Sequence, residues 1–143
     1  MDWRAALRKR LLDSRPASVC ALDAAAHACA AATLPQTPLT PPDAQLAQPC
    51  ALALGIDALD GLDAAQAQQL IHHVRLYRAP RLLLVAHAGC ALDEAAFLAL
   101  GFELAARDAA AGVRLHAFDL DTYKPVPDWL NSRFWANPER WEP

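Results

Sequence analysis

The sequence predicts an α/β domain with a mostly parallel sheet that ends in an antiparallel hairpin, with few strands and with helices on both faces. The continuous apolar run at 50–54 and the run at 81–86, which is apolar after Arg81, are typical of parallel strands that are buried on both sides. Helix-prone segments alternate with these runs, which favours a parallel sheet. Two β-like runs at 102–108 and 113–120 follow, and the short link 109–112 between them favours a hairpin.

The chain has 143 residues, which we interpret as a single domain spanning 1–143. A domain of that size buries about 70% of its unfolded surface, so its core needs no disulfide or metal.

The formal net charge of −3 provides no positive field, and we expect neither nucleic acid nor a membrane as a partner. The segment MDWRAALRKRLL has no apolar signal-peptide core and the cysteines form no C-x-x-C pair, so we expect a reduced cytoplasmic protein.

Residues 1–13 predict an amphipathic helix. Trp3, Leu7 and Leu11 recur at i, i+4 and i+8, which places them on one face, and the arginines lie elsewhere. We expect the apolar face to dock on the domain itself. The alternative is a basic amphipathic helix that lies on a membrane surface.

The first predicted strand, within 16–23, ends in Asp23 and leads into a helix at 24–32. The segment 34–49 that follows is rich in proline. Because proline removes a backbone donor and fixes φ, this segment predicts a surface loop with room for one edge strand.

The next helix is predicted by a capping-box pattern, with Asp63 as the cap and Gln66 three residues later. One stripe of this helix is expected to be buried, and it comprises Ala67, Leu70, Ile71, Val74 and Tyr77. A further helix over 92–100 begins near Asp93, where a carboxylate suits the helix dipole, and stops at Gly101.

Three pieces of the sequence carry a family resemblance: SVCALD at 18–23, the stretch LALGIDALDG to RLLLVA at 52–86, and FLALGFELAARDAAAGVRLHAFDL at 97–120. In this order they resemble the class I S-adenosylmethionine (SAM) methyltransferases, Rossmann-like domains whose sheet ends in such a hairpin. The resemblance implies a methyltransferase-like core over 16–120.

The chain departs from this family at the cofactor site. The family's first strand runs into a glycine-rich turn, whereas residues 22–27 contain no glycine and carry Cβ atoms where the ligand would lie. The family holds the ribose with an acidic residue after its second strand, and the proline-rich segment 34–49 stands in that region here. The sequence therefore predicts a domain without SAM or any other cofactor.

Polar residues follow the predicted strands at the edge where open α/β sheets bind ligands. They are Asp23, His27, Asp57, Asp60 and His87. Such a carboxylate–histidine cluster is suited to acid–base chemistry or to holding a metal. The alternative is that these residues serve turns and helix caps.

Other possible metal or catalytic residues carry a weaker signal. The close pairs His27 with Cys29 and His87 with Cys90 fit structural zinc spacings poorly, and we interpret the cysteines as small buried hydrophobes. His72 and His73 lie beside the apolar stripe, as on a solvated helix face. The pair formed by Asp119 and Asp121 is too short a match to be specific.

The C-terminal segment 121–143 predicts an irregular strap with large aromatic residues, namely Tyr123, Trp129, Phe134, Trp135 and Trp141. It resembles the end of a small group of uncharacterised bacterial proteins that share a YKPxPDWLN…W pattern. Exposed indole rings would promote aggregation, so the strap is expected to cover its own domain. The alternative is that it contacts a partner, either a second copy or another protein.

Three functions from different classes are compatible with these patterns. We favour a non-catalytic, methyltransferase-like binding or interaction module that has lost its SAM site. The second is a SAM-dependent methyltransferase with an altered cofactor loop. The third is a small metal-dependent or acid–base enzyme that uses the Asp/His cluster.

Overall fold

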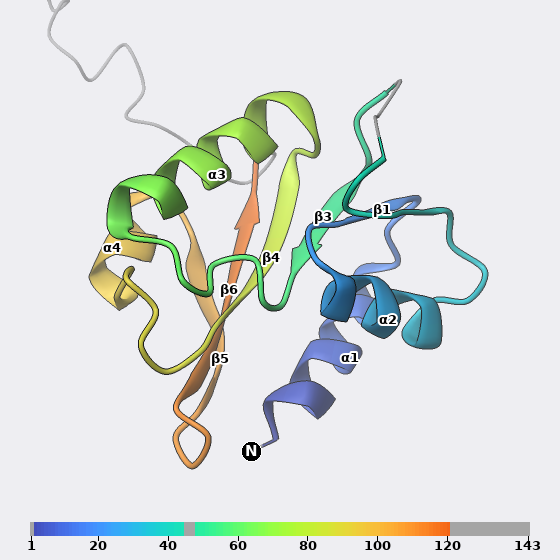
Figure 1. Ribbon diagram of the computed structural model, residues 1–143. Coiled ribbons are helices and arrows are strands. Elements are labelled where there is room, and N and C mark those ends of the chain that lie inside the picture. The colour runs from blue at the N-terminus through green and yellow to red at the C-terminus, as the bar shows by residue number, and fades with distance from the viewer. Residues whose placement is uncertain (1, 45–47, 121–143) are drawn as a thin grey trace, which may run out of the picture.

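A six-stranded mixed sheet forms the centre of the computed structural model, which describes residues 2–44 and 48–120 (Figure 1). The strand order is β2-β1-β3-β4-β6-β5. The strands are β1 (Val19–Ala21), β2 (Leu39–Thr40), β3 (Leu52–Gly55), β4 (Arg81–Ala86), β5 (Glu103–Asp108) and β6 (Val113–Asp119). The first four strands pair in parallel, and β6 pairs antiparallel with both β4 and β5. This sheet confirms the predicted α/β class.

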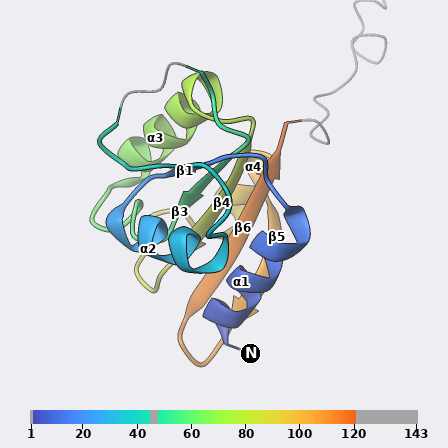
Figure 2. The same cartoon turned by 90° about the vertical axis from the view of Figure 1, so that its right-hand side faces the viewer.

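Helices cover both faces of the sheet (Figures 1 and 2). One face carries α1 (Trp3–Ser14) and α2 (Ala24–Thr33), and the other carries α3 (Ala64–Tyr77) and α4 (Glu94–Ala99). Alternate strand residues point to opposite faces: Leu52 and Leu54 join the core under α1 and α2, whereas Ala53 joins the core under α3. The continuous apolar strands of the sequence are thus buried on both sides, as predicted.

The proline-rich segment contributes the two-residue edge strand β2. It pairs in parallel with β1, and the N–H of Val19 donates to the carbonyl of Pro38 at 2.9 Å. The predicted surface loop with one edge strand is confirmed for the part of this segment that the structure describes.

The N-terminal helix docks on the domain, as its periodicity predicts. Trp3, Leu7 and Leu11 are buried beneath α1 and belong to the core that α2 shares. The carboxylate of Asp108 accepts the N–H of Trp3 at 3.0 Å, which ties the start of α1 to the β5–β6 hairpin. Hydrogen bonds from the N–H groups of Ala111 and then Trp3 lower the pKa of this carboxyl group.

The helix α3 begins with the predicted capping box between Asp63 and Gln66. Its buried residues include Ala67 and Val74, but the prediction is wrong for Tyr77, whose side chain is 64% exposed. At about 100° per residue, Tyr77 lies about 80° from Ala67 around the helix. It is therefore at the margin of the stripe and on the last residue of the helix, where the sheet no longer covers it.

No helix within 2–44 or 48–120 has the length and apolar character needed to span a lipid bilayer.

The core beneath α4 contains one buried histidine, His116, which is 1% exposed and stacks on Phe97 with ring centroids 3.9 Å apart. Burial lowers the pKa of His116 to about 4, and the neighbouring charge of Arg114 acts in the same direction. The folded protein therefore holds this ring neutral at neutral pH.

This depressed pKa predicts a loss of stability in acid. Between pH 6.5 and about 4, His116 binds a proton in the unfolded chain but stays neutral in the folded protein. Protonation therefore favours unfolding. His116→Phe should remove up to about 3 kcal/mol of the difference in unfolding free energy between pH 7 and pH 4, measured by urea denaturation. The exposed His72→Gln serves as the control and should keep the wild-type pH profile. An unchanged profile in His116→Phe would show that His116 does not titrate in this way.

Candidate functional site

The carboxyl ends of β1, β3 and β4 meet at one edge of the sheet, because these strands run in parallel. After β1 the chain crosses to β2 on one side, and β3 then lies on the other side of β1. Such a reversal of strand order is where open α/β sheets form their ligand crevice. The residues that follow these strands include Asp23, Asp57 and His87.

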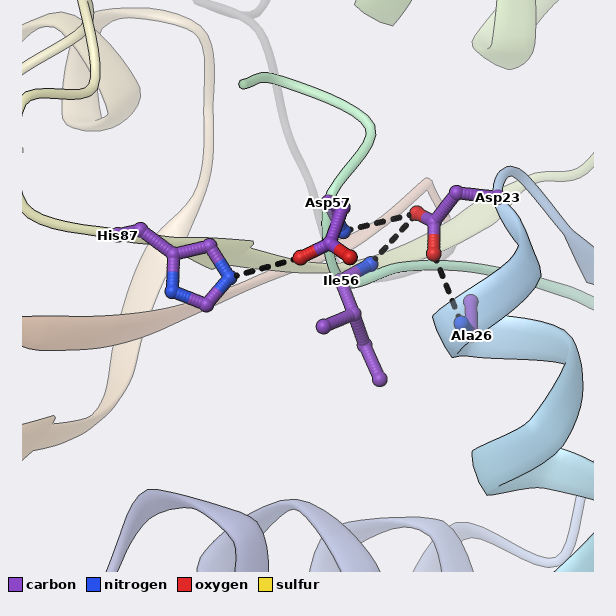
Figure 3. A network of polar contacts seen from close by, with 5 residues as sticks. All are labelled: Asp23, Ala26, Ile56, Asp57 and His87. Carbon is purple, nitrogen blue, oxygen red and sulfur yellow. Dashed lines mark hydrogen bonds and ion pairs between the residues drawn. The ribbon is translucent and has the colours of Figure 1, made fainter.

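The carboxylate of Asp23 links three parts of this edge (Figure 3). As the N-cap of α2, it accepts the N–H of Ala26 at 2.8 Å through Oδ1. Its Oδ2 accepts the N–H groups of Ile56 at 2.9 Å and of Asp57 at 3.0 Å. Three backbone N–H groups at this edge therefore donate to a side chain of the protein itself. This contact also holds the first residues after β3 against the start of α2.

A histidine–carboxylate group lies beside Asp23. The Nε2 of His87 is 3.2 Å from Oδ1 of Asp57, as Figure 3 shows. Candidate ligand atoms of Asp57, Asp60 and His87 all lie within 4.8 Å of one another. The edge of the His87 ring faces Trp3, with centroids 5.6 Å apart and an interplanar angle of 87°. The side chain of Asp57 is half-exposed and that of His87 is partly buried, so both are accessible from solvent.

Asp57, Asp60 and His87 lie together at one edge of the sheet, and their role in chemistry stays a prediction. His27 is not part of this group. It lies one turn into α2 and makes no side-chain hydrogen bond or ion pair within the described residues. Asp23 is at the predicted edge, but its carboxylate is a cap and a bridge.

A cavity of about 290 Å³ opens next to this group, between α1, α2 and the loop after β3. Its apolar wall comes from both helices and from Ile56, and Asp57 and His87 also line it. Trp3, Arg4, Leu7 and Arg8 contribute the α1 side. Sequence reasoning missed these α1 residues as part of a site, because the helix periodicity indicates only which face is buried. The one available signal was the placement of arginines next to that apolar face.

The prediction of buried cysteines is confirmed for Cys20 and Cys50 but is wrong for Cys29 and Cys90, which are only partly buried. Burial raises the pKa of the Cys20 thiol, although the Nε of Arg78 donates to its sulfur at 3.2 Å. His72 and His73 are exposed on α3, as predicted. The predicted strap residues Tyr123, Trp129, Phe134, Trp135 and Trp141, and also Asp121, lie outside the described residues.

Comparison with protein-family models gives one result that covers the chain. Residues 1–143 match the family of unknown function DUF6231. The chain belongs to this family. Neither the curated proteins nor the solved structures gave a match. The DUF6231 description names no activity, so an uncharacterised function agrees with the comparison, and the resemblance to methyltransferases stays a hypothesis for this DUF6231 member.

The bridging role of Asp23 predicts a stability cost that exceeds that of a simple helix cap. Asp23→Ala leaves three N–H groups without their acceptor and should lower the free energy of unfolding by about 2 kcal/mol. Asp63→Ala, which removes the exposed cap of α3, should cost about 1 kcal/mol. Urea denaturation followed by circular dichroism measures both. Equal losses in the two variants would contradict the bridge.

Proposed function

We propose that this chain is a Rossmann-like, methyltransferase-like domain that has lost the SAM site and works as a binding or interaction module. The parallel strands β1, β3 and β4, followed by the antiparallel β5–β6 pair, support the resemblance noted in the sequence. So do the helices on both faces of the sheet. The strands β1 and β2 are short, at three and two residues, which agrees with a reduced fold.

The observation that carries this proposal is the position of the Asp23 carboxylate. In dinucleotide-binding Rossmann folds, the turn after the first strand leaves backbone N–H groups free and lets the ligand approach bare backbone. Here α2 begins at Ala24 directly after the cap, and Asp23 takes the N–H groups of Ala26, Ile56 and Asp57. A ligand bound in that mode would have to displace a carboxylate that accepts three hydrogen bonds and would meet alanine Cβ atoms.

Isothermal titration of the full chain with SAM tests the loss of the cofactor site. We expect no saturable heat, because the donors at the crevice are already satisfied by Asp23. A catalytically active class I methyltransferase titrated under the same conditions provides the control. A micromolar Kd that S-adenosylhomocysteine competes for would favour the alternative, an active methyltransferase with an altered cofactor loop.

The interaction role is assigned to the segment 121–143. Both faces of the sheet already carry helices within the described residues, and their cores are built from residues between Trp3 and Phe118. The aromatic residues of the segment are therefore proposed to contact a partner, either a second copy of the chain or another protein. Trp and Tyr bring large contact areas, and Arg133 and Arg140 add the cation that such interfaces favour.

Truncation after Lys124 tests this assignment. If 125–143 binds a partner, the shortened chain should keep its Tm within about 2 °C, because less than 1 kcal/mol of core packing is lost. If the partner is a second copy, light scattering should show a dimer for the full chain and a monomer for the truncated one. A fall in Tm of 10 °C or more, a scale equivalent to about 3 kcal/mol, would show that the segment belongs to the core.

A second candidate function is favoured by the grouping of Asp57, Asp60 and His87. Their ligand atoms lie within 4.8 Å of one another, and one imidazole with two carboxylates suits Zn²⁺ or Mn²⁺. Such a site at the carboxyl edge would support metal-dependent or acid–base chemistry. The Asp23 bridge fixes the backbone of Asp57, and Trp3 packs against His87, so both ligands are held by the fold.

Metal titration separates this candidate from the first. If the group binds metal, Zn²⁺ or Mn²⁺ should bind in the micromolar range, and Asp60→Asn should weaken binding at least about tenfold because one of three ligands is lost. Asp93→Asn is the matched control, because it changes an exposed carboxylate that caps α4 outside the group. Identical affinities in the two variants would exclude the group as the metal site.

A further inference from the structure

The cavity of about 290 Å³ beneath α1 adjoins the backbone donors that Asp23 occupies, because Ile56 and Asp57 also line it. It is lined by Trp3 and Leu7 of α1, by Ala25 of α2, and by Ile56 after β3. Ligand pockets in proteins span about 300–1,000 Å³, so this cavity suits a small molecule of about ten to fifteen non-hydrogen atoms. The inference drawn here rests on the proposed binding function and names the class of ligand.

The apolar side of the cavity is held rigidly. Trp3 is 6% exposed, and its backbone N–H donates to the carboxylate of buried Asp108. The His87 ring meets the indole edge-to-face, and the Cζ of Arg4 lies 4.5 Å from the indole centroid. Leu7 and Ile56 are also buried in the same core. A flat or branched apolar group would therefore meet a wall that is already in place and would not have to order it.

The charges of the side chains that line the cavity do not balance. Arg4 and Arg8 both line it, and they are four residues apart on α1, where like charges repel. Within the described residues neither guanidinium forms an ion pair, whereas Arg10 on the same helix pairs with Glu103 at 2.9 Å. The Asp57 carboxylate also lines the cavity, 3.2 Å from the Nε2 of His87. The lining therefore holds two guanidinium groups against one carboxylate, which favours an anion at the arginines.

We propose that this cavity binds a small carboxylate with an aromatic or branched apolar body. The apolar body lies against Trp3 and Ile56, and the carboxylate lies between Arg4 and Arg8. Binding relieves the repulsion between the two guanidinium groups and removes apolar surface from water.

The test uses isothermal titration of the full chain with 3-phenylpropanoate and with the neutral 3-phenylpropan-1-ol, which share the same body. We expect the acid to bind at least tenfold more tightly than the alcohol. Arg4→Gln and Arg8→Gln should each weaken binding of the acid about fivefold and leave that of the alcohol unchanged. Lys9→Gln is the matched control, because Lys9 lies between the two arginines in sequence but pairs with Asp13 and does not line the cavity.

A second variant tests the cavity itself without removing any core packing. Ala25→Leu places a larger side chain into the cavity at a helix position where leucine is as well tolerated as alanine, and it should abolish binding of both probes. Ala24→Leu, on the exposed neighbour that does not line the cavity, should bind both as the wild type does. Circular dichroism confirms that each variant is folded.

Three outcomes would overturn the inference. They are no binding of the acid at about 5 mM, equal binding of acid and alcohol, and full binding by Ala25→Leu. These outcomes are distinct from failure of the proposed function, which would appear as SAM binding. SAM can be titrated with the same samples. If SAM binds and competes with 3-phenylpropanoate, the SAM site has not been lost, but the cavity still binds the acid.

Discussion

The carboxylate of Asp23 is the contact on which the candidate site depends. One side chain caps α2, and it holds the backbone N–H groups of Ile56 and Asp57 where the chain leaves β3. Hydrogen bonds between a carboxylate and backbone N–H groups are among the stronger ones in proteins, since the acceptor is charged. This contact sets the position of Asp57 and hence its approach to His87. It also takes backbone N–H groups at the edge of the sheet where a Rossmann-like domain would receive its ligand.

The first helix stabilises the domain and also lines the cavity, and Trp3 and Leu7 take part in both. Its buried face stabilises the domain through Trp3, Leu7 and Leu11, and the Asp108 carboxylate fixes its start. Its neighbouring face presents Arg4 and Arg8 to the cavity. Because these arginines are exposed, their charge can be changed without disturbing the core. Substitutions at Arg4 and Arg8 can therefore test the proposed binding without altering the fold.

Among the charged side chains that the structure describes, several carboxylates have hydrogen-bond partners, whereas two arginines of α1 form no ion pair. Asp23 is satisfied by backbone donors, Asp57 by His87, and Glu94 by Arg107, which lowers the pKa of that glutamate. Arg4 and Arg8 lack such carboxylate partners within the described residues. The two arginines in the lining of the cavity contrast with the overall charge of −3, because local arrangement and not the total determines which ligand is attracted.

Local patterns in the sequence determined the elements of this DUF6231 protein and their buried faces. The capping box of Asp63, the docking face around Leu7 and the apolar strands could be predicted because periodicity and capping depend on neighbours within a few residues. Only the tertiary structure decided which elements meet. It placed β6 between β4 and β5, left Tyr77 exposed at a helix end, left His27 outside the group that contains His87, and brought Arg4 to the cavity. Periodicity describes how a side chain points from its own element, whereas contacts between elements are set by packing across the sheet.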